Sequence, residues 1–282
     1  MKTRLAKFIS DSGAASRRGA EALIESGRVS VNKAIVRTPV FFVDETDAVA
    51  IDGQPIRGRG DTRVFAFNKP VNTVTSAHDP DGRRTIYDVL KQSKTTNPQS
   101  PAPSPQSLKY IGRLDYKTTG LLLLTNDGEL ARKLTLPSSG IARTYIAKLR
   151  AANAAEIKST NIARNLRKFL SPMSSDDAIF DAARRGVAIN GVKYAPMEIE
   201  ILSRYPLSVK ITLREGKKNE IRIVMEHLGL PVSKLQRISF GPIELGNLSP
   251  GDIRELSEQE LKDLTRITLG ANPGPAKIAD FC

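Results

Sequence analysis

The chain has 282 residues, of which 40% are hydrophobic and 26% charged, as is ordinary for a globular protein of one or two domains. It contains one cysteine, Cys282, and two histidines, His78 and His227, too few for a disulfide framework or a zinc site of Cys and His ligands. We find no phosphate-binding glycine loop and no run of about 18 apolar residues, and we expect no signal peptide. The composition therefore argues against metal, nucleotide, redox and membrane functions, and we expect no cofactor.

The charge is strongly unbalanced. Lysine and arginine number 43 and aspartate and glutamate 30, which gives a net charge of +13. An excess of this size favours a polyanionic partner, and RNA and DNA are the commonest ones. The alternative is a basic surface that is merely hydrated. Of the two, we favour nucleic-acid binding.

Residues 1–57 form the first predicted domain. Apolar residues at helical spacing from Leu5 to Ile9 predict one helix, and Ser16 can cap a second helix that Gly27 ends. Short strands are expected at 29–31 and 49–53. Between residues 1 and 37 the net charge is +5, from Lys2, Arg4, Lys7, Arg17, Arg18, Arg28, Lys33 and Arg37 against Asp11, Glu21 and Glu25. This is the densest basic segment of the chain.

Residues 58–62 are predicted to be a flexible linker, and residues 63–265 a second domain that mixes helices and strands. The apolar run Leu121–Leu124 indicates a strand buried on both faces. Asn190-Gly191 between apolar residues predicts a hairpin. Further strands are expected at 64–67, 71–76, 145–149, 197–201 and 207–213.

Three helices of this second domain are predicted from residues that cap a helix start. Thr85 with Asp88 and Ser257 with Glu260 have the spacing of capping boxes, and Asn219 stands before an amphipathic segment that Gly229 closes. The proline-rich segment Lys94–Ser107 is expected to be a loop insertion, and residues 266–282 a flexible tail.

The densest group of candidate catalytic residues is the glycine-bounded loop 112–120. It places Asp115 between Arg113 and Lys117, directly before the buried strand. Nearby cations favour the ionised form of a carboxylate, which can then act as a nucleophile or take up a proton. The alternative is an aspartate that only binds loop amides and a surface arginine. Taken alone, the tripeptide Arg113-Leu114-Asp115 favours this structural alternative.

The surrounding motifs resemble those of the pseudouridine synthases of the RsuA/RluB family. The quoted segments occur in the family's order along most of the chain: Asn68-Lys69-Pro70, Asp79 to Thr85, Arg113-Leu114-Asp115, Thr119 to Gly128, Arg143-Thr144-Tyr145, Glu215 to Arg222, and Leu235 to Leu245. Residues 3–52 resemble the small RNA-binding domain named after ribosomal protein S4, which precedes the catalytic domain in this family. The resemblance leaves out residues 94–107, much of 150–175 and the tail.

The resemblance implies an α+β fold, in which a small RNA-binding domain precedes a catalytic domain with a mixed, largely antiparallel sheet flanked by helices. It implies isomerisation of uridine to pseudouridine in RNA, on a flipped-out base and without a cofactor. Asp115 would be the nucleophile or base, Tyr145 would stack on the uracil, and Arg222 would pair with Asp115 through two parallel hydrogen bonds. The implied RNA contacts are Arg113, which would fill the space that the base leaves, Lys69 on a phosphate, and Arg4, Lys7, Arg17, Arg18 and Arg28.

The resemblance also implies a partner and leaves alternatives. Asp79–Thr85 and the N-terminal domain favour the RluB-like branch, hence large-subunit ribosomal RNA or an assembly intermediate as partner, and a cytoplasmic monomer away from membranes. A synthase of small-subunit RNA and a non-catalytic assembly factor are the alternatives. Asp115, Tyr145 and Arg222 are all present, which argues against the non-catalytic assembly factor. A DNA-binding regulator of the helix-turn-helix type lacks support in the sequence. Three positions depart from the family: Glu220 replaces a glutamine, Ile223 an arginine and Lys33 a glycine.

Overall fold

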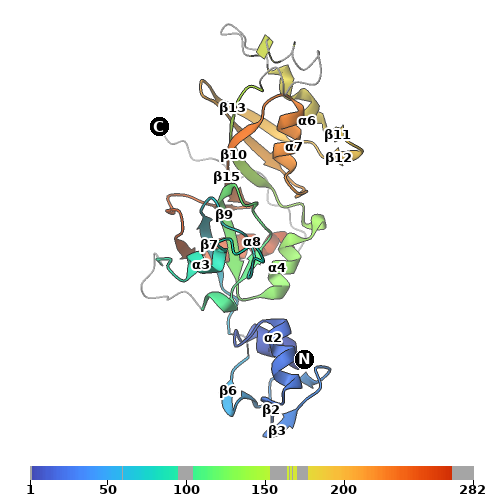
Figure 1. Cartoon of the computed structure of the whole chain (residues 1–282), viewed down its shortest axis with the longest axis vertical. Coiled ribbons are helices and arrows are strands. Elements are labelled where there is room, and N and C mark those ends of the chain that lie inside the picture. Colours follow the sequence, from blue (N-terminus) through green and yellow to red (C-terminus); the bar gives the residue numbers. More distant parts are fainter. Residues whose placement is uncertain are drawn as a thin grey trace.

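The computed structural model describes residues 2–58, 60–94, 104–152 and 177–268, together with residues 164, 166, 168 and 169. The molecule is elongated, with the N-terminal part at one end and the larger part beyond a short connection (Figure 1). The proline-rich insertion from 95 to 103 and the tail beyond 268 lie outside the described residues.

The N-terminal part packs two short helices against small antiparallel sheets. Its elements are β1 (Thr3–Arg4), α1 (Leu5–Asp11), α2 (Arg17–Glu25), β2 (Val29–Val31), β3 (Ala34–Val36), β4 (Phe42–Val43), β5 (Val49–Ile51) and β6 (Gln54–Ile56). Four strands form one sheet in the order β3-β2-β5-β6, and β1 pairs with β4. Leu5, Ile9, Ile24 and Val29 are fully buried in one core cluster. The Ser16 side chain accepts a hydrogen bond from the Gly19 N–H at 3.1 Å, so the predicted cap is present.

A nine-stranded sheet organises the larger part, in the order β13-β14-β10-β15-β9-β7-β17, with β16 paired to β15 and β8 to β9. These strands are β7 (Val64–Lys69), β8 (Lys109–Ile111), β9 (Thr118–Thr125), β10 (Arg143–Leu149), β13 (Glu198–Arg204), β14 (Leu207–Leu213), β15 (Val232–Phe240), β16 (Ile243–Glu244) and β17 (Ile253–Glu255). The pairing of β15 with β9 is parallel, whereas the other pairs are antiparallel. The sheet is therefore mixed and mostly antiparallel, which confirms the predicted α+β class.

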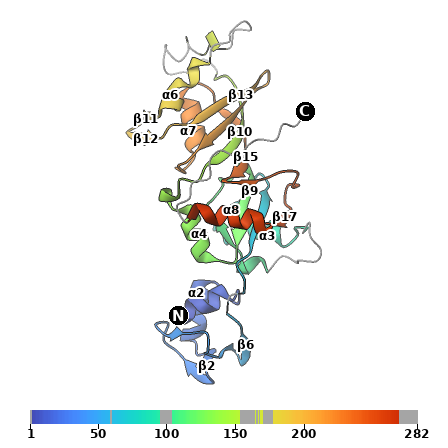
Figure 2. The same ribbon diagram turned by 180° about the vertical axis from the view of Figure 1, so that it is seen from behind.

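Helices cover both faces of this sheet. They are α3 (Ile86–Leu90), α4 (Gly128–Thr135), α6 (Asp181–Arg185), α7 (Glu220–His227) and α8 (Glu258–Thr268), with single 3-10 turns at Pro105–Ser107, Pro137–Ser139 and Ala178–Phe180. A separate hairpin joins β11 (Val187–Ile189) to β12 (Val192–Tyr194). Figure 2 shows α8 lying across the central strands. Helix α8 ends at Thr268, three residues beyond the expected end of the second domain at 265.

Alternating residues of β7 and β9 belong to two cores, one on each face of the sheet. Phe65, Phe67, Leu122 and Leu124 pack in a cluster that includes side chains of α3 and α7. Val64, Ala66, Leu121 and Leu123 pack in a second cluster with side chains of α4 and α8. All four leucines are fully buried, as the apolar run predicts.

Local sequence signals are confirmed at several turns and caps and fail at two places. The Thr85–Asp88 and Ser257–Glu260 capping boxes form, and Asn190-Gly191 turns the β11–β12 hairpin. The strand expected at 71–76 is wrong: it is reduced to one bridge between Val74 and Thr85, because Asn72 has a φ of 55°, which breaks an extended backbone. Asn219 precedes α7 but makes no side-chain cap, since it too is left-handed, at a φ of 55°.

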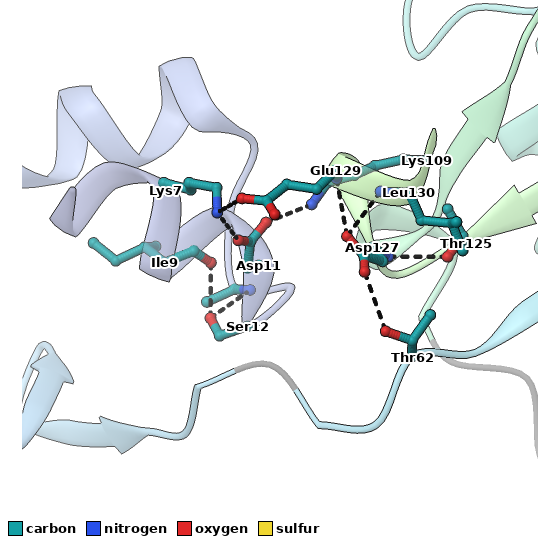
Figure 3. Close-up of polar contacts among 11 residues, drawn as sticks. Lys7, Ile9, Asp11, Ser12, Thr62, Lys109, Thr125, Asp127, Glu129 and Leu130 are labelled. Carbon is teal, nitrogen blue, oxygen red and sulfur yellow. Dashed lines mark hydrogen bonds and ion pairs between the residues drawn. The ribbon is translucent and has the colours of Figure 1, made fainter. Parts of the chain in front are cut away.

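A cluster of ionic contacts joins the N-terminal part to the larger one (Figure 3). The Lys7 ammonium lies 2.7 Å from a Glu129 carboxylate oxygen and 3.5 Å from Asp11. Asp11 in turn accepts a hydrogen bond from Lys109 at 2.8 Å. The hydrogen bond to Glu129 is the main reason that the pKa of Lys7 is raised. The contact therefore pairs Lys7 and Asp11 of α1 with the opposite charges of Glu129 on α4 and Lys109 on β8.

Candidate active site

A cavity of about 620 Å³ opens between β9, β10, β15 and the start of α7. This volume is in the range of about 300–1,000 Å³ that is typical of small-ligand sites. Four predicted residues that are far apart in the sequence line it: Arg113, Asp115, Tyr145 and Arg222. The fold thus brings the proposed catalytic residues to one place.

Asp115 lies in the turn that leads into β9. Its backbone carbonyl accepts a hydrogen bond from the Thr118 N–H at 3.0 Å, and its side chain is exposed. Among the described residues, the Asp115 carboxylate has no hydrogen-bond or ion-pair partner. The carboxylate is therefore available to a substrate that enters the cavity.

The buried ammonium of Lys69 binds the backbone of the Asp115 turn. Its side chain is fully buried, and its ammonium donates to the carbonyls of Thr118 at 2.9 Å and of Pro70 and Asp115 at 3.2 Å. Burial lowers the pKa of Lys69 to about 8, against the opposing effect of Asp115. In this structure the Lys69 ammonium has main-chain carbonyls as partners, in the place of the expected RNA phosphate.

Tyr145 stands in the middle of the sheet, on β10. It is paired across the ladder with Ile211 of β14 and Arg237 of β15, and it is 9% exposed. Tyr145 and Asp115 line the same cavity. This placement suits the predicted stacking on a base.

Arg222 lies in the first turn of α7, near Asp115 but without a direct bond to it. Its guanidinium donates to the carbonyls of Val232 at 3.1 Å and Lys117 at 3.3 Å. Burial lowers the pKa of Arg222, and Asp115 acts in the opposite direction, so the two charges interact through space. The predicted pair of parallel hydrogen bonds to Asp115 is absent in this structure, where the guanidinium binds two main-chain carbonyls.

Two further arginines of the wall were missed as site residues. The guanidinium of Arg143 donates to the Glu215 carbonyl at 3.1 Å, and burial lowers its pKa. Arg237 is 1% exposed; its Nε donates to the Leu121 carbonyl at 2.6 Å, and its Nη2 has no hydrogen-bond partner among the described residues. Only the resemblance of residues 235–245 to the family motif could have indicated Arg237.

Gly120 makes the close approach of β15 to β9 possible. It has a φ of +99°, and a Cβ at this position would lie 2.2 Å from the Arg237 carbonyl oxygen. Any side chain would therefore push the two parallel strands apart, and the motif glycine is needed on steric grounds.

The five basic residues predicted in the N-terminal part have different environments. Arg17 and Arg18 are exposed at the start of α2, with no ion pair among the described residues. Arg4 lies 6.0 Å from the centre of the Phe42 ring, and Arg28 pairs with Asp52 at the surface. Lys7 is engaged at the junction described above, so it is not free to bind a phosphate. Arg17 and Arg18 are the best remaining candidates.

Comparison with known proteins identifies both parts of the chain. Residues 63–227 match the RNA pseudouridylate synthase family, and residues 3–57 match the S4 domain. The chain is 34% identical over 265 residues to ribosomal large subunit pseudouridine synthase B of Bacillus subtilis, covering 93% of this chain and 95% of that protein. It is also 34% identical to an RNA pseudouridine synthase of Rickettsia typhi, over 93% of this chain and 94% of the relative.

A solved structure of a pseudouridylate synthase superposes with a TM-score of 0.58 at 25% identity, covering 93% of this chain and 99% of that one. No described helix is long and apolar enough to cross a membrane. The match of more than half the chain, together with these relatives, establishes that the protein belongs to the RNA pseudouridine synthase family and carries an N-terminal S4 domain.

Proposed function

We propose that this protein converts a specific uridine of large-subunit ribosomal RNA to pseudouridine, with Asp115 as the catalytic carboxylate. The observation that carries the proposal is the position of Asp115, which is exposed and unpaired at a cavity that Tyr145 and Arg222 also line. The Bacillus subtilis relative, named as a large-subunit enzyme, supports the choice of RNA.

The reaction needs no external reagent. The bond from N1 of uracil to C1′ of the ribose breaks, the base turns, and a bond from C5 to the same C1′ forms. One proton leaves C5 and one is gained at N1, so atoms and electrons balance. The Asp115 carboxylate either attacks C1′ or removes a ribose proton, and both steps require its ionised form.

The surrounding side chains have separate roles in this proposal. The target base leaves its stack, at a cost of a few kcal/mol, and enters the cavity, where Tyr145 stacks on it. Arg222 adds positive charge near Asp115 through space, and Arg113 fills the gap that the base leaves. Residues 1–57 act as an RNA-binding domain through Arg17 and Arg18, with 58–62 as the linker to the catalytic domain, 63–265.

Mapping of pseudouridine in ribosomal RNA tests the proposal directly. We expect one or a few sites in large-subunit RNA that disappear when the protein is absent and reappear with wild type. Asp115→Asn, which is nearly isosteric, should not restore them and should lower turnover by at least about 1,000-fold, with RNA affinity within several-fold of wild type. The exposed linker variant Asp61→Asn is the matched control and should restore them.

The alternatives give different maps. Sites confined to small-subunit RNA would reassign the substrate, and an unchanged map despite RNA binding would indicate a non-catalytic assembly factor. Wild-type turnover in Asp115→Asn would refute the role of Asp115.

A further inference from the structure

Glu220 is an acid buried in the wall of the cavity. It is the first residue of α7 and is 4% exposed. Its Oε2 accepts a hydrogen bond from the Lys217 N–H at 3.0 Å, whereas its Oε1 is buried and has no hydrogen-bond donor among the described residues. A buried carboxylate oxygen without a donor is costly when the group is ionised.

A second acid, Glu215, lies beside it. Its Oε1 accepts a hydrogen bond from the Ala195 N–H at 2.5 Å, and its Oε2 pairs with the Lys217 ammonium. Lys217 thus binds both acids, one through its main chain and one through its side chain. Two neighbouring acids with one ammonium carry a net negative charge unless one of them keeps a proton.

Apart from Lys217, no cation of the described residues forms an ion pair with either acid. Arg143, from β10, lies close enough to interact with Glu220 through space, but its guanidinium donates its hydrogen bond to the Glu215 carbonyl. Tyr145 acts to raise the pKa of Arg143, and Arg237 acts to lower it. No cation of the described residues forms an ion pair with the Glu220 carboxyl group.

The electrostatics of the two acids agree with this arrangement. Burial and then Glu215 raise the pKa of Glu220 to about 8. Burial also acts to raise the pKa of Glu215, but hydrogen bonds with Glu220, Ala195 and Lys217 outweigh it and keep that pKa below its usual range. When two carboxyl groups compete for one proton, the pKa of one is raised and the pKa of the other is lowered.

We propose that Glu215 and Glu220 share one proton, and that the neutral Glu220 carboxyl group is a positioning residue that holds the segment 214–222 in the cavity wall. This segment carries Arg222, so the pair acts on the reaction through the placement of that helix. When the proton is lost, two adjacent negative charges repel each other in a wall that an RNA substrate must approach. The inference rests on the proposed function, because it takes this cavity as the uridine site.

The first test is the pH dependence of turnover in wild type, Glu220→Gln and the matched control Glu226→Gln. Glutamine keeps an acceptor for the Lys217 N–H and supplies a donor towards Glu215 without a titrating proton, whereas Glu226 is exposed on the same helix. With a midpoint near 8, turnover of wild type and Glu226→Gln should fall at least about tenfold from pH 7 to pH 9. The fall in Glu220→Gln should be about tenfold smaller than in wild type; any loss through Lys69, whose pKa is also about 8, is common to all three proteins. An equal fall in Glu220→Gln would overturn the proposal.

The second test does not depend on activity. In the free protein labelled with ¹³C at the glutamate carboxyl groups, one resonance should titrate with a midpoint near pH 8 in wild type and in Glu226→Gln, and be missing in Glu220→Gln. If every glutamate titrates below about pH 6, the shared proton does not exist. A titration near 8 in a protein that forms no pseudouridine would refute the proposed function and leave the proton pair standing.

Discussion

Replacing Lys69 by methionine would test whether the buried ammonium supports the Asp115 turn. Methionine has nearly the same length and apolar stem, so the substitution leaves no large cavity but removes every donor. The carbonyls of Pro70, Asp115 and Thr118, which the ammonium now binds, would be left without this donor. Two of these carbonyls belong to the turn that presents the proposed catalytic carboxylate of Asp115.

The expected loss of stability is the energy of the three hydrogen bonds minus the cost of burying the Lys69 charge. Three hydrogen bonds from a charged donor contribute about 1.5–3 kcal/mol each, or about 4.5–9 kcal/mol together. Burial of the charge opposes this, since a fall in the pKa of Lys69 from 10.5 to about 8 corresponds to about 3.4 kcal/mol at 1.36 kcal/mol per unit. We therefore expect Lys69→Met to lower the free energy of unfolding by about 1–6 kcal/mol.

Urea unfolding at pH 7, followed by circular dichroism, measures this difference against Lys133→Met. Lys133 is exposed on α4 and makes no ion pair among the described residues, so its replacement should change stability by less than about 0.5 kcal/mol. Turnover of Lys69→Met should fall further than the folded fraction does, because the Asp115 turn loses its support. Stability and turnover equal to those of Lys133→Met would refute the reasoning.

Three other variants test the remaining parts of the site. Tyr145→Phe should keep RNA affinity within about threefold, because the ring remains for stacking, and a wild-type rate would show that the hydroxyl takes no part in catalysis. Arg222→Ala should lower single-turnover rates more than tenfold, and Arg222→Lys should recover part of the rate, since it restores the charge near Asp115 but not the planar fork; equal rates in all three proteins would remove Arg222 from the mechanism. Deletion of residues 1–57 should reduce the slope of log affinity against log salt by about 0.7–0.9 for each RNA phosphate that this domain neutralises, and an unchanged slope would exclude the domain from RNA binding.

Much of the fold follows from local sequence patterns. The run Leu121–Leu124 is buried on both faces because β9 is a central strand with a core on each side. Thr85 with Asp88 and Asn190 with Gly191 adopt the predicted cap and turn, since these structures depend on neighbouring residues alone. Patterns of this range locate most elements, but the strand expected at 71–76 and the Asn219 cap fail because Asn72 and Asn219 adopt a positive φ.

Contacts between distant segments could not be predicted from the sequence. Lys69 precedes a proline at the end of a strand, where a lysine usually reaches solvent, and only the packing of β7 against the Asp115 turn encloses it. Arg222 has carbonyl partners from Val232 and Lys117, which no spacing in the sequence indicates. Family-like motifs indicate the candidate catalytic residues, whereas the contacts that hold them are visible only in the three-dimensional structure.

Lys69 and Glu220 together predict an unusual dependence of stability on pH. The pKa of Glu220 is raised from 4.5 to about 8 on folding, so its contribution is complete below 4.5 and is lost as the pH rises through 8. The pKa of Lys69 is lowered from 10.5 to about 8, so its contribution is complete above 10.5 and is lost as the pH falls through 8. Stability should therefore pass through a minimum near pH 8, with slopes of up to about 1.4 kcal/mol per pH unit on either side. Urea midpoints at about pH 5.5, 8 and 10 measure this minimum; Glu220→Gln should remove the fall on the acid side, and Lys69→Met the rise on the alkaline side. Parallel profiles in wild type and both variants would show that neither group is shifted.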